Sequence, residues 1–174
     1  MNPPTPFTLR NAELRDVAAI VQLIRDLAGF EKLTHLLQVT PEKLRPQLFG
    51  ERPAAQALVA ELGDGKGSDG KGGEVVAFAL FFTNFSTFLA QPGLYLEDLY
   101  VKPECRGLGI GKALLTRLAA IAVERDYGRF EWSVLDWNED AIRFYKGMGA
   151  DVMPEWRICR VTGDELARLG GTAA

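Results

Sequence analysis

The chain has 174 residues and a formal net charge of −3, with 47% hydrophobic and 25% charged residues, the profile of one globular domain that buries roughly 70% of its unfolded surface without disulfides or metals. Its 20 basic and 23 acidic residues leave no basic surplus for phosphates, which argues against nucleic acid as the main partner. The longest apolar run, at residues 75–82, is eight residues, far short of the ~20 that a membrane-spanning helix needs.

The first part of the chain predicts one strand and two helices. Polar alternation over residues 7–10 is typical of a short strand. Residues 13–28 place apolar side chains at helical spacing and end before Gly29, which predicts an amphipathic helix. A second helix is expected at residues 41–49, because Thr40 is a suitable N-cap, Pro41 suits the first helical position and Gly50 ends the pattern.

Two strands are expected next, at residues 54–62 and 75–83, joined by a glycine-rich segment at residues 63–73. Six of the eleven residues in this segment are glycine, which predicts a flexible, exposed hairpin loop. A loop that grips phosphate would lead into a helix, whereas this one leads into a strand.

The second half of the chain alternates strands and helices. Strands are expected at residues 94–101, 130–135 and 156–162, and helices at residues 110–124 and from the N-cap Asn138 to Met148. Together with the first half, this order predicts a mixed α/β fold around one core.

The composition disfavours several kinds of catalytic chemistry. His35 is the only histidine, so zinc–histidine and Ser-His-Asp sites are not expected. Cys105 and Cys159 lie in no CxxC pattern and are expected to be reduced thiols. Residues 1–6 lack the basic and apolar regions of a signal peptide, so we expect a cytoplasmic protein. Catalysis is therefore expected to use carboxylates, tyrosine, backbone groups or a cofactor.

The most informative segment is a glycine-rich turn between the expected strand at residues 94–101 and the helix at residues 110–124. It reads Arg106-Gly107-Leu108-Gly109-Ile110-Gly111-Lys112. Such a turn places unpaired backbone N–H groups at the positive end of the helix dipole, which favours a phosphate or pyrophosphate ligand. The glycine spacing differs from the Rossmann fingerprint, and Ala113 stands where a Walker loop has Ser or Thr.

The R-x-x-G-x-G pattern formed by Arg106, Gly109 and Gly111 resembles the coenzyme-A pyrophosphate loop of the GNAT acetyltransferases. Within that family, four further segments resemble the diamine branch, which comprises the spermidine/spermine and thialysine acetyltransferases. These segments are Leu27-Ala28-Gly29-Phe30-Glu31, Tyr95-Leu96-Glu97-Asp98-Leu99-Tyr100-Val101, Trp137-Asn138-Glu139 and Phe144-Tyr145-Lys146. The likeness extends from about residue 7 to residue 169, apart from the glycine-rich segment.

The resemblance implies a GNAT fold, in which a central, mostly antiparallel twisted sheet of six to seven strands is flanked by about four helices. It implies a single domain over residues 1–174 with flexible ends at residues 1–6 and 170–174. It also implies a homodimer formed partly by the strand at residues 156–162. The implied reaction is direct transfer of acetyl from acetyl-CoA, the cosubstrate, to a primary amine without a metal.

The same resemblance implies catalytic roles for Glu97 and Tyr145. An alkyl amine has a pKa near 10.4, so a base must take its proton before attack. Glu97 would do so through a water molecule, and Asp98 would face the opposite way on a regular strand. Tyr145 would then protonate the leaving thiolate. Without the family context, Glu97 would be read as a solvated strand carboxylate and Tyr145 as a core aromatic.

The residues implied to bind acetyl-CoA lie at a strand end, in the glycine turn and in the last long helical segment. They are Leu99, Tyr100, Val101, Arg106, Gly107, Leu108, Gly109, Ile110, Gly111, Lys112, Asn138, Ala141 and Tyr145. A capping role alone would also explain Asn138. The residues implied to bind the acceptor amine are Phe30, Glu31, Glu97, Glu131, Trp132, Ser133 and Glu155.

The predicted acceptor pocket departs from the polyamine pattern after Glu31. The diamine branch is markedly acidic there, whereas this chain continues Lys32-Leu33-Thr34-His35-Leu36-Leu37. A flexible polycation needs several carboxylates, so this departure favours a smaller amine or a lysine-like amino acid over spermidine and spermine. A protein or peptide acetyltransferase and a non-catalytic CoA-binding sensor are the alternatives, and the presence of both Glu97 and Tyr145 argues against the sensor.

Overall fold

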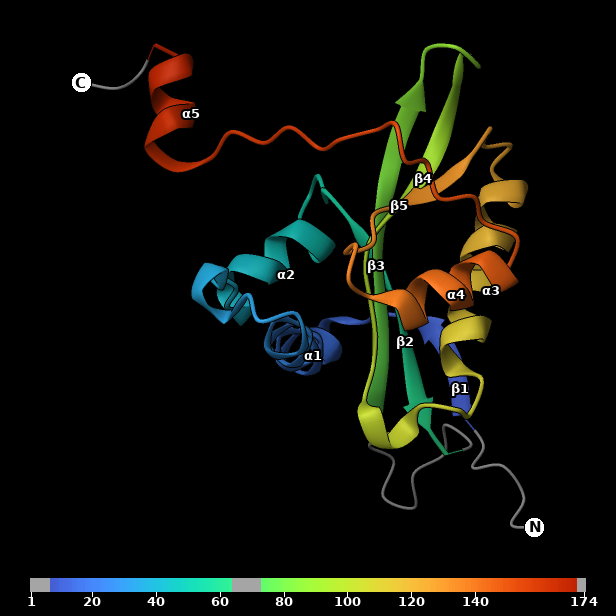
Figure 1. Cartoon of the computed structure of the whole chain (residues 1–174). Helices are drawn as coiled ribbons and strands as arrows, with labels where there is room; N and C mark the ends of the chain where they lie inside the picture. Colours follow the sequence, from blue (N-terminus) through green and yellow to red (C-terminus); the bar gives the residue numbers. More distant parts are fainter. Residues whose placement is uncertain (1–6, 64–72, 172–174) are drawn as a thin grey trace. The chain divides into compact units, whose positions relative to one another are not determined.

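The computed structural model describes residues 7–63 and 73–171, and most of the glycine-rich segment expected to form a hairpin loop lies outside the described residues. The chain divides into two compact units, Met1–Ser133 and Val134–Ala174. The first unit holds the sheet that the described residues form, together with the helices that cover it (Figure 1).

The sheet has five strands in the order β1-β2-β3-β4-β5, so each strand lies beside its neighbour in sequence. The first four are β1 (Phe7–Asn11), β2 (Gln56–Leu62), β3 (Val75–Ser86) and β4 (Gln91–Val101), and they pair antiparallel. The last, β5 (Phe130–Trp132), runs parallel to β4. A parallel pair requires a crossover, which the helix between these two strands supplies.

Helices cover both faces of this sheet (Figure 1). On one face lie α1 (Val17–Phe30) and α2 (Pro41–Phe49), with the short 3-10 turns η1 (Leu14–Asp16) and η2 (Thr34–Leu36). On the other face lies α3 (Ile110–Glu124), which follows the 3-10 turn η3 (Pro103–Cys105). The α1 face holds a continuous core, because Ile20 and Leu23 of α1 pack in one cluster with Phe78 and Tyr100 of the sheet. The predicted bounds of α2 and α3 are confirmed, as is the Thr40 cap, whose Oγ1 accepts from the Lys43 N–H.

A buried ion-pair network ties β1 to the start of α1 and to β2. The Arg10 guanidinium lies 2.6 Å from an Asp16 oxygen and 2.7 Å from a Glu61 oxygen, and both carboxylates are 3% exposed. Burial alone would raise the pKa of Asp16, but the hydrogen bonds from Arg10 and from the Glu13 N–H outweigh it, and the pKa is lowered. Each buried charge is thus paired, as the low-dielectric interior requires.

The second unit consists of two helices and an extended segment. Its helices are α4 (Glu139–Gly147) and α5 (Gly163–Leu169). The strand expected at residues 156–162 is wrong, because these residues form no regular structure and Trp156, Ile158 and Val161 are exposed. A strand needs a neighbour to satisfy its backbone groups, and this segment pairs with no other described segment.

The structure therefore corrects the expected element count. The described residues form five strands and five α-helices instead of six to seven strands and about four helices. The strand expected to reach residue 135 ends at Trp132, and α5 was not expected. None of the helices in residues 7–63 and 73–171 is long and apolar enough to cross a membrane.

Candidate functional site

A β-bulge interrupts β4 at Glu97. Leu96 pairs with Phe81 of β3, and the next pair joins Asp98 to Leu80, which leaves Glu97 without a partner on β3. The pairing between β4 and β5 runs from Leu94 to Leu96 and stops at the same point. Among the described strands, β4 beyond the bulge is therefore paired along one edge only. A bulge of this kind re-aims the side chains that follow it.

The bulge turns Asp98 toward the face of the sheet that α1 covers. Asp98 pairs with Leu80, and two residues further Tyr100 pairs with Phe78, which belongs to the core beneath α1. Leu96 and Asp98 thus lie on opposite faces although they are two residues apart. The expectation that Asp98 faces the opposite way from Glu97 assumed a regular strand, and the bulge removes that condition.

Three carboxylates influence one another at this place. Burial and, to a smaller extent, the negative charges of Glu97 and Glu31 together raise the pKa of Asp98 to about 6. Glu31 directly follows the last residue of α1, and burial raises the pKa of its carboxyl as well. Glu97 itself is exposed. A half-buried carboxylate whose ionisation is disfavoured by two neighbouring negative charges is a suitable site for a cation.

Asp98 is the residue that sequence reasoning missed. On a regular strand, alternation would turn its side chain to the face opposite Glu97. The adjacent pair Glu97-Asp98 within an otherwise apolar strand was a signal in the sequence, but the bulge that makes Asp98 relevant depends on the register with β3.

The glycine turn after β4 has the backbone shape that an anion site requires. Gly107 and Gly109 adopt φ values of 79° and 83°, a left-handed conformation that favours glycine. Gly109 is the N-cap of α3, and its carbonyl accepts from the Ala113 N–H. The N–H groups of the first helical turn, Ile110 to Lys112, therefore face the helix entrance without helical partners. The first turn holds no acidic side chain, so its dipole is available to a phosphate.

Arg106, the first residue of the turn, reaches back to the sheet and to α1. Its Nε donates to the Val101 carbonyl over 3.1 Å. The guanidinium carbon lies 5.2 Å from the ring centre of Phe30 and 5.6 Å from that of Tyr100. Two residues expected to bind acetyl-CoA and one expected to bind the acceptor thus meet Arg106.

The residues predicted on β5 for acceptor binding are engaged within the first unit. Glu131 lies 2.9 Å from the Arg129 Nε and also accepts from the Asn84 Nδ2 at 2.9 Å. Ser133 shares a 2.9 Å hydrogen bond with the Tyr95 hydroxyl. The Trp132 ring centre is 4.8 Å from that of Phe130.

The packing around Glu131 is tight. A Cβ on Gly93 would come within 2.4 Å of the Asn84 Oδ1 and 2.8 Å of the Arg129 Cγ. Glycine at this position therefore leaves the space in which the side chains of Asn84 and Arg129, both partners of Glu131, pack against the backbone of β4.

The remaining predicted residues belong to the second unit. Asn138 is the N-cap of α4, and its Oδ1 accepts from the Ala141 N–H at 3.2 Å, which confirms the expected cap. Tyr145 is half-buried on α4, and its ring centre lies 5.5 Å from that of Phe144. Glu155 is exposed in a turn of the extended segment.

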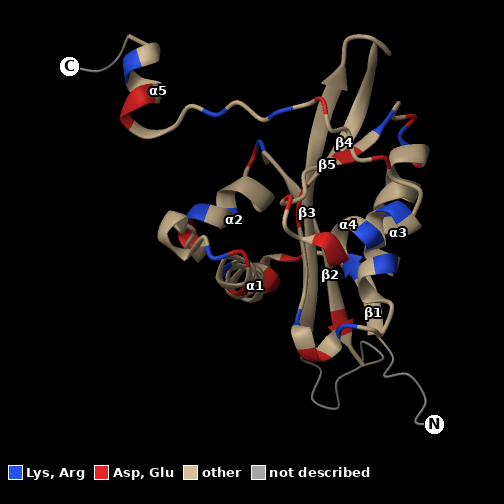
Figure 2. Ribbon diagram, in the orientation of Figure 1, with Lys and Arg blue, Asp and Glu red and all other residues tan. Residues whose placement is uncertain are grey.

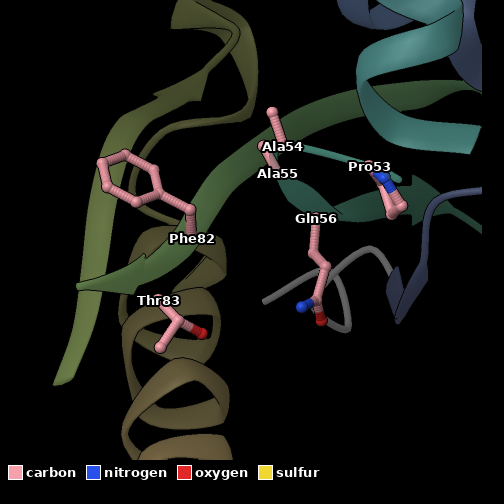
Figure 3. A pocket seen from close by; sticks show the side chains of 6 residues that line it. All are labelled: Pro53, Ala54, Ala55, Gln56, Phe82 and Thr83. Atoms are coloured by element: carbon pink, nitrogen blue, oxygen red, sulfur yellow. The ribbon is translucent and has the colours of Figure 1, made fainter. Parts of the chain in front are cut away.

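A surface hollow of about 250 Å³ lies elsewhere on the first unit (Figure 3). It is lined by Pro53, Ala54, Ala55, Gln56, Phe82 and Thr83. Thr83 shares a 2.8 Å hydrogen bond with the Tyr127 hydroxyl, and Gln56 accepts from Arg125 at 2.8 Å. The hollow includes none of the predicted site residues, and the side chains of Thr83 and Gln56 already have hydrogen-bond partners. We therefore do not assign the hollow to the functional site.

Charged side chains of both signs occur on the first unit. Acidic and basic residues both occur on the helices that flank the sheet (Figure 2). Within residues 7–63 and 73–171, no cluster of three or more His, Cys, Asp or Glu side chains is arranged to hold a metal ion.

Comparison with known proteins places this geometry in context. The model of the acetyltransferase (GNAT) family matches residues 20–150. An L-ornithine N5-acetyltransferase of Arabidopsis thaliana is 38% identical, with 92% of this chain and 86% of that protein covered. A thialysine N-epsilon-acetyltransferase of Mus musculus is 37% identical, with 94% and 96% covered.

A solved structure shares the fold. An integron cassette protein from the mobile metagenome of V. cholerae superimposes with a TM-score of 0.74 at 24% identity, covering 94% of this chain and 97% of that one. At this identity, the likeness concerns the fold alone.

Proposed function

The chain belongs to the acetyltransferase (GNAT) family and is an N-acetyltransferase of small-molecule amines, and from this premise we propose that its acceptor is the side-chain amine of a short basic amino acid or a diamine of similar length. The observation that carries the proposal is the convergence of Glu31, Glu97 and Asp98 beside the bulge of β4. Relatives named for ornithine and thialysine act on amines of this kind. The continuation Lys32-Leu33 after Glu31 provides no further carboxylates for a long polycation.

The glycine turn and the open edge of β4 fit acetyl-CoA. The helix entrance at Gly109–Lys112 suits the pyrophosphate, and β4 beyond Leu96 has an edge that pairs with no other described strand. Acetyl-CoA, when bound, supplies the thioester that is attacked. Leu99, Tyr100 and Val101 would hold the acyl arm along that edge, and their backbone N–H groups would stabilise the oxyanion that develops.

The acceptor enters as an ammonium ion and must lose a proton. Asp98 and Glu31 hold the positive charge of the acceptor at the bulge, and exposed Glu97 accepts the proton through a water molecule. The amine nitrogen then bonds to the acetyl carbon as the C–S bond breaks. Tyr145 donates its phenolic proton to the sulfur that leaves. These assignments rest on the family pattern together with the carboxylate cluster.

The proposal extends to the state of the protein. We take residues 1–174 to work as one acetyltransferase domain in the cytoplasm, since Cys105 and Cys159 are both free thiols. We also take it to act as a homodimer, with the exposed apolar side chains of the segment before α5 in the interface. Trp156 is 70% exposed and Ile158 68%, and apolar groups of this size favour burial against another surface.

Release of CoA from acetyl-CoA in the presence of different amines tests the acceptor class. The panel contains ornithine, thialysine, lysine, putrescine, spermidine and a lysine-containing peptide. We expect the highest kcat/KM with ornithine or thialysine and the lowest with the peptide. Preference for the peptide would contradict the proposal in favour of a protein acetyltransferase. Binding of acetyl-CoA without turnover of any amine would favour the sensor.

A further inference from the structure

Arg106 lies between the expected acetyl-CoA turn and the expected acceptor site, two parts of the site that are far apart in the sequence. The turn that it begins is expected to hold acetyl-CoA, whereas Phe30, over which its guanidinium lies at 5.2 Å, precedes Glu31 of the acceptor site. Tyr100, the second ring at 5.6 Å, lies on β4 two residues beyond Asp98. Arg106 thus contacts a residue adjacent to Glu31 and a residue two positions from Asp98, and both of these carboxylates are half-buried.

The contacts of Arg106 point inward from the turn. Its Nε donates to the Val101 carbonyl, and its guanidinium carbon lies over two aromatic rings. A guanidinium over aromatic faces is attracted by their quadrupoles while it stays solvated at its edge. Lysine, with a compact ammonium and no planar fork, does not reproduce this geometry.

We propose that Arg106 is a positioning residue that couples the acetyl-CoA turn to the acceptor site by holding Phe30, and with it Glu31, against β4. The proposal rests on the proposed acetyl transfer to a small amine. It differs from a direct contact of the Arg106 side chain with phosphate, because its consequence falls on the amine. When the arginine is lost, the end of α1 is released, and Glu31 no longer shares a fixed place with Asp98.

Steady-state kinetics of Arg106→Met tests this coupling, because methionine keeps a long apolar side chain and removes the guanidinium. Two cation–π contacts of ordinary strength correspond to roughly a 5- to 30-fold effect, and we expect the amine KM to rise by about this factor with kcat nearly unchanged. Phe30→Leu, which removes one of the two contacts, should also raise it, and by more than Phe30→Tyr, which keeps the ring. The double variant Arg106→Met/Phe30→Leu should be no worse than the poorer single variant.

The matched control is Arg125→Met. Arg125 also lies over an aromatic ring, that of Tyr127 at 5.9 Å, and belongs to no part of the proposed site, so the amine KM should stay at the wild-type value. Arg106→Lys serves as a second variant if Arg106→Met does not fold, and it should also raise the amine KM.

The outcomes separate the coupling from a phosphate contact. A rise in the acetyl-CoA KM alone, with an unchanged amine KM and effects that multiply in the double variant, would overturn the proposal. If the wild-type protein acetylates no amine, the proposed function fails. The coupling is then measured from the thermal unfolding of the wild type, Arg106→Met, Phe30→Leu and the double variant. If the losses of stability in the two single variants do not add up in the double variant, the contact is supported; if they do add up, it is refuted.

Discussion

Titration of the Asp98 carboxyl group makes the stability of the folded protein depend on pH. Burial, reinforced by Glu97 and Glu31, raises its pKa to about 6, whereas an aspartate in an unfolded chain titrates near 3.9. Between these values the folded protein binds the extra proton, so stability falls as pH rises through this window. Above pH 6 the charged side chain destabilises the fold by about 2–3 kcal/mol.

Asp98→Asn should therefore be more stable than the wild type at pH 8 by up to that amount and lose its advantage below pH 4. Denaturant unfolding at a series of pH values measures the difference. Asp151→Asn, at an exposed position outside the helices and strands, is the control and should show no such trend. A constant difference between Asp98→Asn and wild type across the range would contradict the buried, mutually repelling arrangement.

Glu97 is predicted to act on the proton of the amine and not on its binding alone. Glu97→Gln keeps the size of the side chain and removes its basicity, so activity should be displaced to higher pH, where more of the free amine is already deprotonated. The pH profile of kcat/KM for the preferred amine checks this. An unshifted profile would return Glu97 to the solvated strand carboxylate that its exposure also allows.

At the scale of elements, the turn before α3 depends on two left-handed glycines. Gly109 has a φ of 83°, and no heavy atom lies within 4 Å of the Cβ that a substitution would add. The cost of Gly109→Ala is therefore backbone strain and not a clash, about 1 kcal/mol. We expect a comparable loss of unfolding free energy and a several-fold rise in the acetyl-CoA KM.

Gly147→Ala provides the matched control for the turn. Gly147 lies in α4 with open space around its Cβ position, and alanine is the better helix former. Stability should stay constant or rise. Should Gly109→Ala behave like this control in both stability and acetyl-CoA KM, the left-handed turn is not required for the cofactor.

Short-range sequence patterns, such as capping residues and the spacing of apolar side chains, were enough to predict several helices. The Thr40 and Asn138 caps and the spacing of apolar residues gave α2 and α3 their bounds and placed the start of α4. The bulge at Glu97 was not predictable in this way, because it exists only in the register between β4 and β3. Residues 156–162 have the alternation of a strand, but alternation does not supply a partner. The acids Asp164 and Glu165 in the first turn of α5 were a helix signal that went unused.

The same holds for the candidate site: its local parts were predictable, and the parts that depend on contacts between distant residues were not. The glycine turn follows from spacing and glycine content, whereas the left-handed backbone of Gly107 and Gly109 is known from the structure. The role of Glu131 did not follow from the sequence, because its ion pair with Arg129 and its hydrogen bond from Asn84 join β5, the residue before it and β3. The reach of Arg106 to Phe30 joins residues far apart in the chain and depends on the packing of α1 against the sheet.

At the scale of the whole molecule, the proposed dimer makes a prediction about mass. Size-exclusion chromatography with light scattering should give twice the mass of the 19.2 kDa chain. The variant Trp156→Ser/Ile158→Ser removes the two most exposed of the named apolar side chains before α5 and should shift the protein toward monomer. A monomeric wild type at all accessible concentrations would exclude this interface.

In the proposed mechanism, acetyl transfer to a small amine requires that the carboxylates beside the bulge bind the acceptor. The most direct measurement is the KM of Asp98→Asn at pH 8 for ornithine or thialysine, whichever the wild type prefers, beside its KM for acetyl-CoA. Because a hydrogen bond to a charged group contributes about 1.5–3 kcal/mol, we predict a rise of roughly 10-fold or more in the amine KM with the acetyl-CoA KM unchanged. An amine KM equal to that of the wild type would contradict the claim and move the acceptor site away from Asp98.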